Sequence, residues 1–374
     1  MASRAFHERA KGLLALAGVE LGGACPWDLD VHDQAFYRRV LSGGSLALGE
    51  TYMEGLWDCP QIDAFVCRVL EAGLDERVGS FVRLLAVARA VLSNAQAPSR
   101  AFTVGECHYD LGNELYRSML DSRMIYSSGY WEHASTLDEA QESKLELVCR
   151  KMGLEAGMSV LDIGCGWGGT AKFAAERYGV NVVGITVSRQ QAELGRETCV
   201  GFPIEIRLQD YRTMEGTFDR AISIGMFEHV GCRNYRTFFR VVRKHLKDDG
   251  LFLLHTIGSP RTMPAGEPWT DKYIFPNSML PSARQICQAM EGLFVLEDWH
   301  NFGADYDRTL MCWFGNFDRN WDQLRQAYDD RFYRMWKYYL LSSAGAFRAR
   351  KQHVWQLVLS PRGVRGGYRA PHRG

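Results

Sequence analysis

The sequence predicts an α/β protein in which a large domain is built on a mostly parallel sheet and a smaller helical domain precedes it. Two observations indicate this class. After residue 150, short apolar runs alternate with helical patterns, whereas strand-like alternation is scarce in the first hundred residues. Because parallel strands require crossover connections, such alternation is typical of βαβ units in a sheet that is buried on both faces.

The first hundred residues predict helices and then a linker. Apolar residues recur every three or four positions in Gln34–Leu41, Ile62–Ala72 and Arg77–Leu92. The following segment, Ser93–Ala101, is small and polar and contains a proline, as linkers do. We therefore expect a helical domain over residues 1–95 and a second domain over residues 96–360.

The second domain begins with two predicted helices, Asn113–Leu120 and Thr136–Met152. Five predicted strands follow: Ser159–Ile163, Asn181–Thr186, Ile204–Leu208, Arg220–Ile224 and Leu251–His255. Helical patterns separate them, as at Gly169–Tyr178 and Tyr235–Leu246. This order predicts a Rossmann-like sheet with right-handed crossovers.

The end of the chain predicts a closing hairpin and a tail. The runs Phe294–Asn301 and Thr309–Phe314 are joined by a short polar loop, which favours an antiparallel hairpin. Gly258–Glu291 contains five prolines and is too long for a simple connection, so we expect it to be functional. The Gly- and Arg-rich residues 361–374 predict a disordered tail.

Composition excludes several classes of protein. The chain has 374 residues, with 44 Lys and Arg against 44 Asp and Glu. Nucleic-acid binding is disfavoured because it is driven by excess positive charge. The ten cysteines form no CxxC pair, which argues against a zinc site and favours reduced thiols in the cytoplasm. No apolar run is long enough to span a bilayer, so any membrane contact is expected to be peripheral.

A glycine-rich turn predicts the cofactor site. The strand that contains Asp162 runs into Gly164, Gly166 and two further glycines, at the end of the strand where open α/β sheets bind ligands. A dinucleotide fold would add an acid after the second strand, but here that strand ends with Thr186. An acid that accepts from an amine, before glycines that admit a ligand, is instead typical of S-adenosyl-L-methionine-dependent methyltransferases. The alternative is that Asp162 only caps the turn.

The third strand leads into Gln209, Asp210 and Tyr211, where that fold places adenine contacts. Asp210 could equally cap the next helix.

Glu228 and His255 predict the reaction site. They follow the fourth strand and end the fifth, so both should lie at the same edge of the sheet as the cofactor. They could position a general base, bind a small ion or orient each other, or His255 could be hydrogen-bonded only locally. A second carboxylate or histidine at metal-ligand spacing is missing, and no Gly-x-Ser-x-Gly elbow supports hydrolase chemistry.

With these motifs the chain resembles the cyclopropane-fatty-acyl-phospholipid synthases and the mycolic acid cyclopropane synthases. The resemblance covers about Val31 to Ser360. It rests on YDLGN (109–113), YSSGYW (126–131), VLDIGCGWGG (160–169), VGITVSRQQ (183–191), LQDYR (208–212), GMFEHVG (225–231), LLHTIG (253–258), KYIFPN (272–277), EDWHNFGADYD (297–307) and AGAFRAR (344–350).

The resemblance implies a class I methyltransferase fold and an enzyme that transfers a methylene group from S-adenosyl-L-methionine to the cis double bond of an unsaturated phospholipid acyl chain. It also implies a homodimer, peripheral to the inner face of the membrane, with a helical domain that associates with lipid. A bound bicarbonate ion would be the base, held by the side chains of Glu228, His255 and Tyr306 with backbone help near Ser128 and Ile257. Implied cofactor contacts are Tyr126, Ser127, Gly164, Thr186, Gln191, Gln209 and Tyr211.

Several alternatives remain at this point. Tyr126 and Tyr211 could be core aromatics, and Gln191 could be a solvated helix residue. The family commonly has cysteine where this chain has Ser128 and Ser343, so a cysteine is not expected to be essential. The same scaffold could also serve a lipid or small-molecule methyltransferase that adds a methyl branch, or a lipid-binding protein without turnover. Arg77–Leu92 could lie against a membrane or pack on its own domain.

Overall fold

The computed structural model describes residues 2–78, 112–263 and 265–371. The chain forms two compact units. The first contains residues 1–94, 264–276 and 307–352, and the second contains residues 95–263, 277–306 and 353–374. The sequence predicted one continuous segment for each domain, whereas the first unit also takes two later segments of the chain. The expected linker and nearly all of the expected helix Arg77–Leu92 lie outside the described residues.

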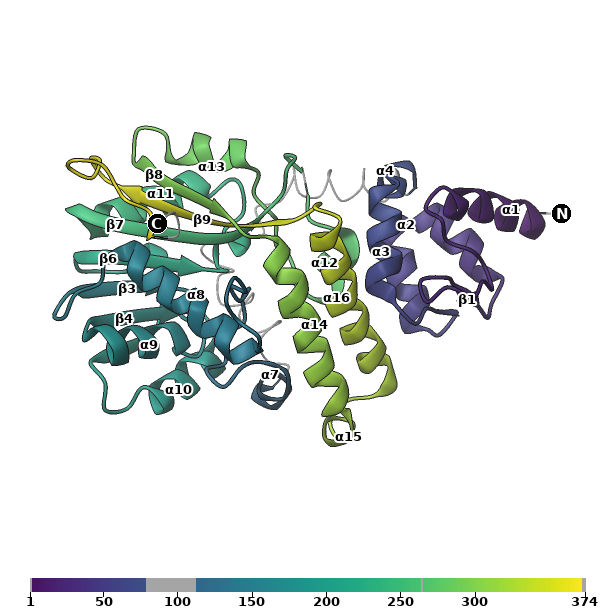
Figure 1. Cartoon of the computed structure of the whole chain (residues 1–374), viewed down its shortest axis with the longest axis horizontal. Coiled ribbons are helices and arrows are strands. Elements are labelled where there is room, and N and C mark those ends of the chain that lie inside the picture. Colours follow the sequence, from purple (N-terminus) through teal and green to yellow (C-terminus); the bar gives the residue numbers. More distant parts are fainter. Residues whose placement is uncertain (1, 79–111, 264, 372–374) are drawn as a thin grey trace. The chain divides into compact units, whose positions relative to one another are not determined.

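The second unit is built on a seven-stranded sheet (Figure 1). Its strands are β3 (Ser159–Ile163), β4 (Asn181–Thr186), β5 (Ile204–Leu208), β6 (Phe218–Ile224), β7 (Leu246–Gly258), β8 (Val295–Asn301) and β9 (His353–Ser360). The order across the sheet is β5-β4-β3-β6-β7-β9-β8. The first five of these are parallel, and β9 is antiparallel to both of its neighbours. This confirms the predicted α/β class with an antiparallel closure.

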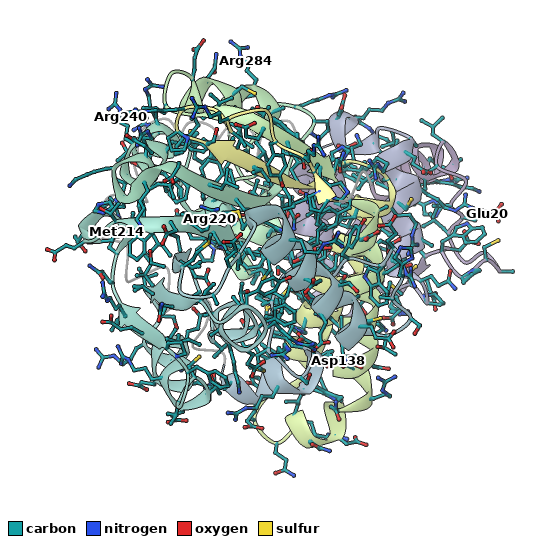
Figure 2. All side chains as sticks on the ribbon, turned by 60° about the vertical axis from the view of Figure 1, so that its left-hand side comes forward. Glu20, Asp138, Met214, Arg220, Arg240 and Arg284 are labelled. Carbon is teal, nitrogen blue, oxygen red and sulfur yellow. The ribbon has the colours of Figure 1, made fainter. Side chains whose placement is uncertain are left out.

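Helices cover both faces of this sheet (Figure 1). The described helices of this unit are α7 (Asn113–Met119), α8 (Leu137–Met152), α9 (Gly169–Tyr178), α10 (Arg189–Thr198), α11 (Tyr235–His245) and α13 (Ala283–Met290), with single 3₁₀ turns η2 (Tyr211–Thr213) and η3 (Phe227–His229). Leu145 of α8 and Phe173 of α9 pack on one face, and Phe238 of α11 and Ile286 of α13 pack on the other. The charged residues Arg240 and Arg284 of α11 and α13 are exposed (Figure 2).

The predicted closing hairpin is wrong. Thr309–Phe314 lies inside helix α14 (Ala304–Arg319), and β8 pairs instead with β9, far later in the chain. A six-residue apolar run fits a buried strand and a buried helix face equally well, and its neighbours decide the matter. Here the run continues an apolar helical face that includes Leu310, Trp313 and Phe317.

The predicted disordered tail is also wrong for residues 361–371, which the structure describes. Val364 and Tyr368 pack against the core between the sheet and helices α8 and α9. The Tyr368 hydroxyl donates to the Lys151 carbonyl at 2.9 Å. Composition suggested a solvated segment, but two apolar side chains are enough to hold the tail on the sheet.

The first unit is helical, as its amino-terminal sequence predicted. It contains α1 (Ala2–Ala15), α2 (Ala35–Met53), α3 (Ile62–Glu71), α4 (Leu74–Arg77), α12 (Pro268–Tyr273), α15 (Trp321–Leu324), α16 (Asp330–Arg348) and most of α14, with a short pair of strands, β1 (Asp30–Val31) and β2 (Trp57–Asp58). Trp57 is fully buried against Phe65 and Tyr338. No described helix of the chain is both long enough and apolar enough to cross a membrane.

Gly49 of α2 gives a test of this packing. A β-carbon built there would lie 2.4 Å from the Trp269 ring of α12. Gly49→Ala should therefore lower the free energy of unfolding by about 1–3 kcal/mol through overpacking. Gly315→Ala in α14 is the matched control, because no described atom lies within 4 Å of its β-carbon. That change should raise stability by about 0.5–1 kcal/mol through helix propensity. Thermal and urea unfolding measure both, and equal effects would contradict the packing.

Candidate active site

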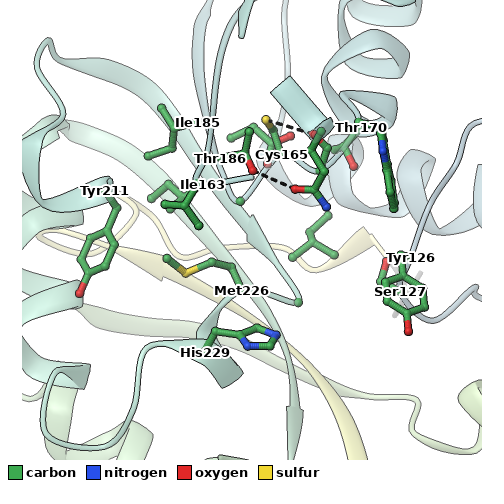
Figure 3. Close-up of a pocket in the computed structure, with 18 of the residues that line it drawn as sticks. Tyr126, Ser127, Ile163, Cys165, Thr170, Ile185, Thr186, Tyr211, Met226 and His229 are labelled. Carbon is green, nitrogen blue, oxygen red and sulfur yellow. Dashed lines mark hydrogen bonds between the residues drawn. The ribbon is translucent and has the colours of Figure 1, made fainter. Parts of the chain in front are cut away.

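A pocket opens at the carboxyl ends of the parallel strands, the edge where such sheets bind ligands. Its walls come from the segment before α8, the glycine turn after β3, the ends of β4 and β6, and η2. Tyr126 and Ser127 lie on the opposite side of the pocket from Tyr211 (Figure 3). All ten predicted cofactor residues line it: Tyr126, Ser127, Asp162, Gly164, Gly166, Thr186, Gln191, Gln209, Asp210 and Tyr211.

The glycine turn is shaped by two constraints. The backbone N–H groups of Gly164 and Cys165 both donate to the Ile185 carbonyl, at 2.9 and 3.0 Å, so the turn folds back over β4. Gly164 has φ +83°, and a β-carbon there would lie 2.7 Å from Cβ of Met226. Glycine is therefore required both for the backbone conformation and for the space on the pocket floor.

Asp162 places a buried carboxylate at this pocket. The residue is only 1% exposed, and its Oδ2 has no hydrogen-bond partner among the described residues. Burial raises the pKa of this carboxyl to about 7, against the opposing effect of Lys144. An unpaired buried acceptor is costly unless a ligand supplies a donor, which fits the amine of S-adenosyl-L-methionine. Its Oδ2 therefore does not act as a cap of the turn.

The remaining pocket residues are held by local hydrogen bonds. Thr186 Oγ1 donates to Gln191 Oε1 at 2.8 Å, and Gln191 is buried, so it is not a solvated helix residue (Figure 3). Asp210 accepts from the Arg212 backbone N–H at 2.8 Å and pairs with its guanidinium. Asp210 thus caps η2 as the structural alternative proposed, and it lines the pocket as well. Tyr211 likewise packs on Phe238 in the core.

Glu228 and Ile257 meet directly, whereas His255, Tyr306 and Ser128 lie on β7, on α14 and in the segment before α8. Glu228 Oε1 accepts from the Ile257 backbone N–H at 2.6 Å. Its Oε2 is buried and has no partner among the described residues. Burial raises the pKa of the Glu228 carboxyl to about 7, although the Ile257 hydrogen bond opposes this shift. One oxygen is therefore anchored, and the other can serve a ligand.

His255 lies two residues before Ile257 on β7 and is 2% exposed. Burial lowers the pKa of this imidazole well below its usual value, and the charges of Lys144 and Lys151 lower it further, so the ring is neutral. Its Nδ1 lies 3.2 Å from Nε2 of Gln356, the residue opposite it on β9. With the amide assigned in this orientation, Nδ1 accepts and Nε2 carries the proton.

Tyr306 and Ser128 complete the predicted set. Tyr306 is buried at the start of α14, one turn after Phe302, whose ring packs on His255. Ser128 is fully buried, and its hydroxyl donates to the Gly129 carbonyl at 2.8 Å. The Glu228, His255, Tyr306, Ser128 and Ile257 group does not line the pocket described above.

Sequence reasoning missed three polar groups near these sites. Lys144 and Lys151 of α8 are fully buried, and so is Gln356 of β9. A signal was present, because the two lysines are seven residues apart and fall on the same helical face as Leu137 and Val148. Within the described ranges, no group of three His, Cys, Asp or Glu side chains could hold a metal ion.

Comparison with known proteins decides the family. The family model described as mycolic acid cyclopropane synthetase matches residues 96–357. The chain belongs to this family. It is therefore an S-adenosyl-L-methionine-dependent methyltransferase by class. A family member from Escherichia coli (strain K12), cyclopropane-fatty-acyl-phospholipid synthase, is 51% identical over 97% of this chain and 95% of its own length.

Other members of the family match about two thirds of the chain. Cyclopropane mycolic acid synthase 2 of Mycobacterium leprae is 35% identical over 68% of this chain and 92% of its own length. The crystal structure of the mycolic acid cyclopropane synthase CmaA1 complexed with SAH and CTAB superposes with a TM-score of 0.65 at 32% identity. It covers 69% of this chain and 97% of that one.

Proposed function

We propose that this protein forms cyclopropane fatty acids by transferring a methylene group from S-adenosyl-L-methionine to the cis double bond of unsaturated phospholipid acyl chains. The observation that carries the proposal is the 51% identity to the Escherichia coli cyclopropane-fatty-acyl-phospholipid synthase along 97% of the chain. The arrangement of the site supports it, because a ligand pocket with an unpaired buried acid lies at the same sheet edge as Glu228 and His255.

The pocket residues would hold the cofactor, which supplies an electrophilic methyl group when bound. Asp162 would accept from the cofactor's amine, and Gly164 and Gly166 would leave room for its methionine portion. Gln209, Asp210 and Tyr211 would lie beside the adenine, and Tyr126 and Ser127 would contact the opposite end. Since an alkene is a weak nucleophile, fixed orientation is the main contribution that these residues can make.

We further propose that Glu228, His255 and Tyr306 hold a bicarbonate ion as the base. Like charges repel, so an ionised Glu228 could hold this anion only by accepting from its hydroxyl group. The free Oε2 of Glu228 suits that role. A neutral His255 with its proton on Nε2, together with the Tyr306 hydroxyl, would donate to the other oxygens. The backbone near Ser128 and Ile257 would complete the site.

The substrate implies contact with a membrane surface. We propose peripheral association at the inner face of the membrane and a homodimer, both on the ground of the family alone. Neither depends on the residues of the site. Vesicle sedimentation with anionic and neutral lipids, and analytical ultracentrifugation, measure these two properties separately.

The proposed reaction is tested by the mass of the product. Incubation with S-adenosyl-L-methionine, bicarbonate and vesicles of an unsaturated phospholipid should add one CH₂ to the acyl chain. With a fully deuterated methyl donor, a cyclopropane keeps two of the three methyl deuterium atoms. The same vesicles made with a saturated phospholipid are the control and should show no change.

Methyl branching is the second candidate, because the relatives include a probable fatty acid methyltransferase of Pseudomonas putida, 37% identical over 64% of this chain. A saturated methyl branch forms when the cation left by methyl transfer accepts a hydride from an added reductant, such as a reduced nicotinamide cofactor, instead of losing a proton from the methyl group. That product would keep all three deuterium atoms. An unchanged mass with bicarbonate present would contradict both enzymatic proposals and favour a lipid-binding protein.

A further inference from the structure

Helix α8 carries a fully buried lysine next to the cofactor pocket. Lys144 has no exposed surface, which is rare for a lysine because an ammonium group loses its hydration when it is buried. Its Nζ donates to the Ser127 hydroxyl at 2.9 Å. Ser127 lines the pocket, so this contact links the helix to the ligand site.

Two more hydrogen bonds fix the same segment on α8. Gln141, one turn before Lys144, donates through Nε2 to the Ser127 carbonyl at 2.8 Å. The Tyr130 backbone N–H donates to the Ala140 carbonyl at 2.9 Å. Close packing assists, because a β-carbon on Gly129 would lie 2.9 Å from Cβ of Ala140. The wall of the pocket that contains Ser127 is therefore clamped along one face of α8.

Lys144 also faces the buried acid of the pocket. Side chains alternate along β3, so Asp162 shares the face of Val160, which packs in the same core as Leu145 of α8. Burial lowers the pKa of the Lys144 ammonium to about 8, and the nearby carboxylates of Asp121 and Asp162 oppose that effect. Asp121 is occupied by the backbone N–H groups of Ile125 and Arg123, at 2.8 and 3.0 Å. Asp162 has no such donor on Oδ2.

We propose that Lys144 is a positioning residue for cofactor binding, which holds the Ser127 hydroxyl and supplies the counter-charge that keeps Asp162 an acceptor for the cofactor's amine. The inference deepens the proposed function, since it rests on the cofactor assignment of the pocket. It does not depend on the acyl substrate or on bicarbonate.

The pH dependence follows from the charged and titratable groups around the pair. Asp162 faces Lys144 of α8, and the nearby thiols of Cys165 and Cys199 are neutral, since burial and the charge of Asp162 raise the pKa of both. Lys144 faces Asp121, Asp162 and the neutral His255. Without the ammonium, the pKa of Asp162 rises further above about 7, so this carboxyl stays protonated to higher pH. Binding should then weaken at neutral pH and recover as the pH rises.

The test measures the affinity of S-adenosylhomocysteine by calorimetry from pH 6 to 9. Lys144→Met keeps the length of the side chain and removes its charge. We expect about tenfold weaker binding at pH 7. We also expect the acid limb of the affinity profile, the range in which binding weakens as the pH falls, to move to higher pH. Lys151→Met is the matched control, because Lys151 is equally buried on the same helix but contacts His300 and Asp298, at 3.2 and 3.5 Å. It should leave affinity and profile unchanged.

Three further variants test the roles of Ser127 and Asp162 separately and cover the case in which Lys144→Met does not fold. Ser127→Ala should weaken binding without moving the acid limb, and Asp162→Asn should abolish that limb. If Lys144→Met does not fold, the Lys144→Met/Asp162→Asn double variant should, because it removes the ammonium together with the carboxylate that lacks a donor on Oδ2, while Asp121 keeps its backbone donors. An unchanged affinity profile in Lys144→Met, an equal effect in Lys151→Met, or an acid limb that persists in Asp162→Asn would each overturn the proposal. If the unmodified chain does not bind S-adenosylhomocysteine at all, the cofactor assignment of the proposed function fails instead.

Discussion

Replacement of Glu228 by glutamine is expected to slow methylene transfer by about a hundredfold or more, while S-adenosylhomocysteine binds with unchanged affinity. Glutamine keeps the oxygen that accepts from the Ile257 backbone N–H, so the local fold survives. It replaces the unpaired Oε2 with a donor, and the site can no longer accept from the hydroxyl of an anion. Product mass and calorimetry measure the two effects on one preparation.

The pH profile of turnover distinguishes loss of the Glu228 carboxylate from a general loss of folded protein. Burial raises the pKa of the Glu228 carboxyl to about 7, so the carboxylate is lost as the pH falls through that value. At constant bicarbonate and at a concentration of S-adenosyl-L-methionine that saturates the chain at every pH, turnover of the unmodified chain should therefore fall on the acid side, and the residual activity of Glu228→Gln should lack that limb. Glu193→Gln on the exposed side of α10 is the control and should change nothing. Loss of cofactor affinity in Glu228→Gln would show that its role was assigned wrongly.

Gly164→Val should reduce binding of S-adenosylhomocysteine by about a hundredfold or more, because it adds a branched side chain where the β-carbon alone already collides with Met226. The change also imposes strain, since φ is +83° at this position. Gly157→Val is the control for backbone strain without a collision, because Gly157 has φ +86° and no described atom lies within 4 Å of its β-carbon. The control should lose stability and keep its affinity. Equal affinity losses in calorimetry would contradict a cofactor site at this turn.

The parallel part of the fold could be predicted because its signals are local. The strand before Gly164 and the strand before Glu228 are short apolar runs with helical patterns between them, and buried parallel strands produce this pattern. The last strand, β9, was missed, and Thr309–Phe314 was assigned in its place. Both segments are apolar, and only pairing with distant strands makes one of them extended.

The candidate site shows the same difference between features set by neighbouring residues and features set by distant ones. A glycine turn and an acid at a strand end are properties of neighbouring residues, so the pocket positions of Asp162 and Gly164 could be predicted. Lys144 was missed because a lysine on a helix is usually solvated, and its burial depends on a sheet formed later in the chain. Gln356 was missed because its contact with His255 joins residues 101 positions apart.

The position of β9 has a consequence for how the protein acquires its activity. This strand is the last of the sheet to be synthesised, yet it lies between β7 and β8. Until the ribosome has added Ser360, β7 and β8 each have an open edge of unpaired backbone groups, which is where nascent chains associate wrongly. Gln356 reaches His255 only when β9 inserts. The nascent chain can therefore complete its cofactor pocket well before the hydrogen bond that orients His255 exists.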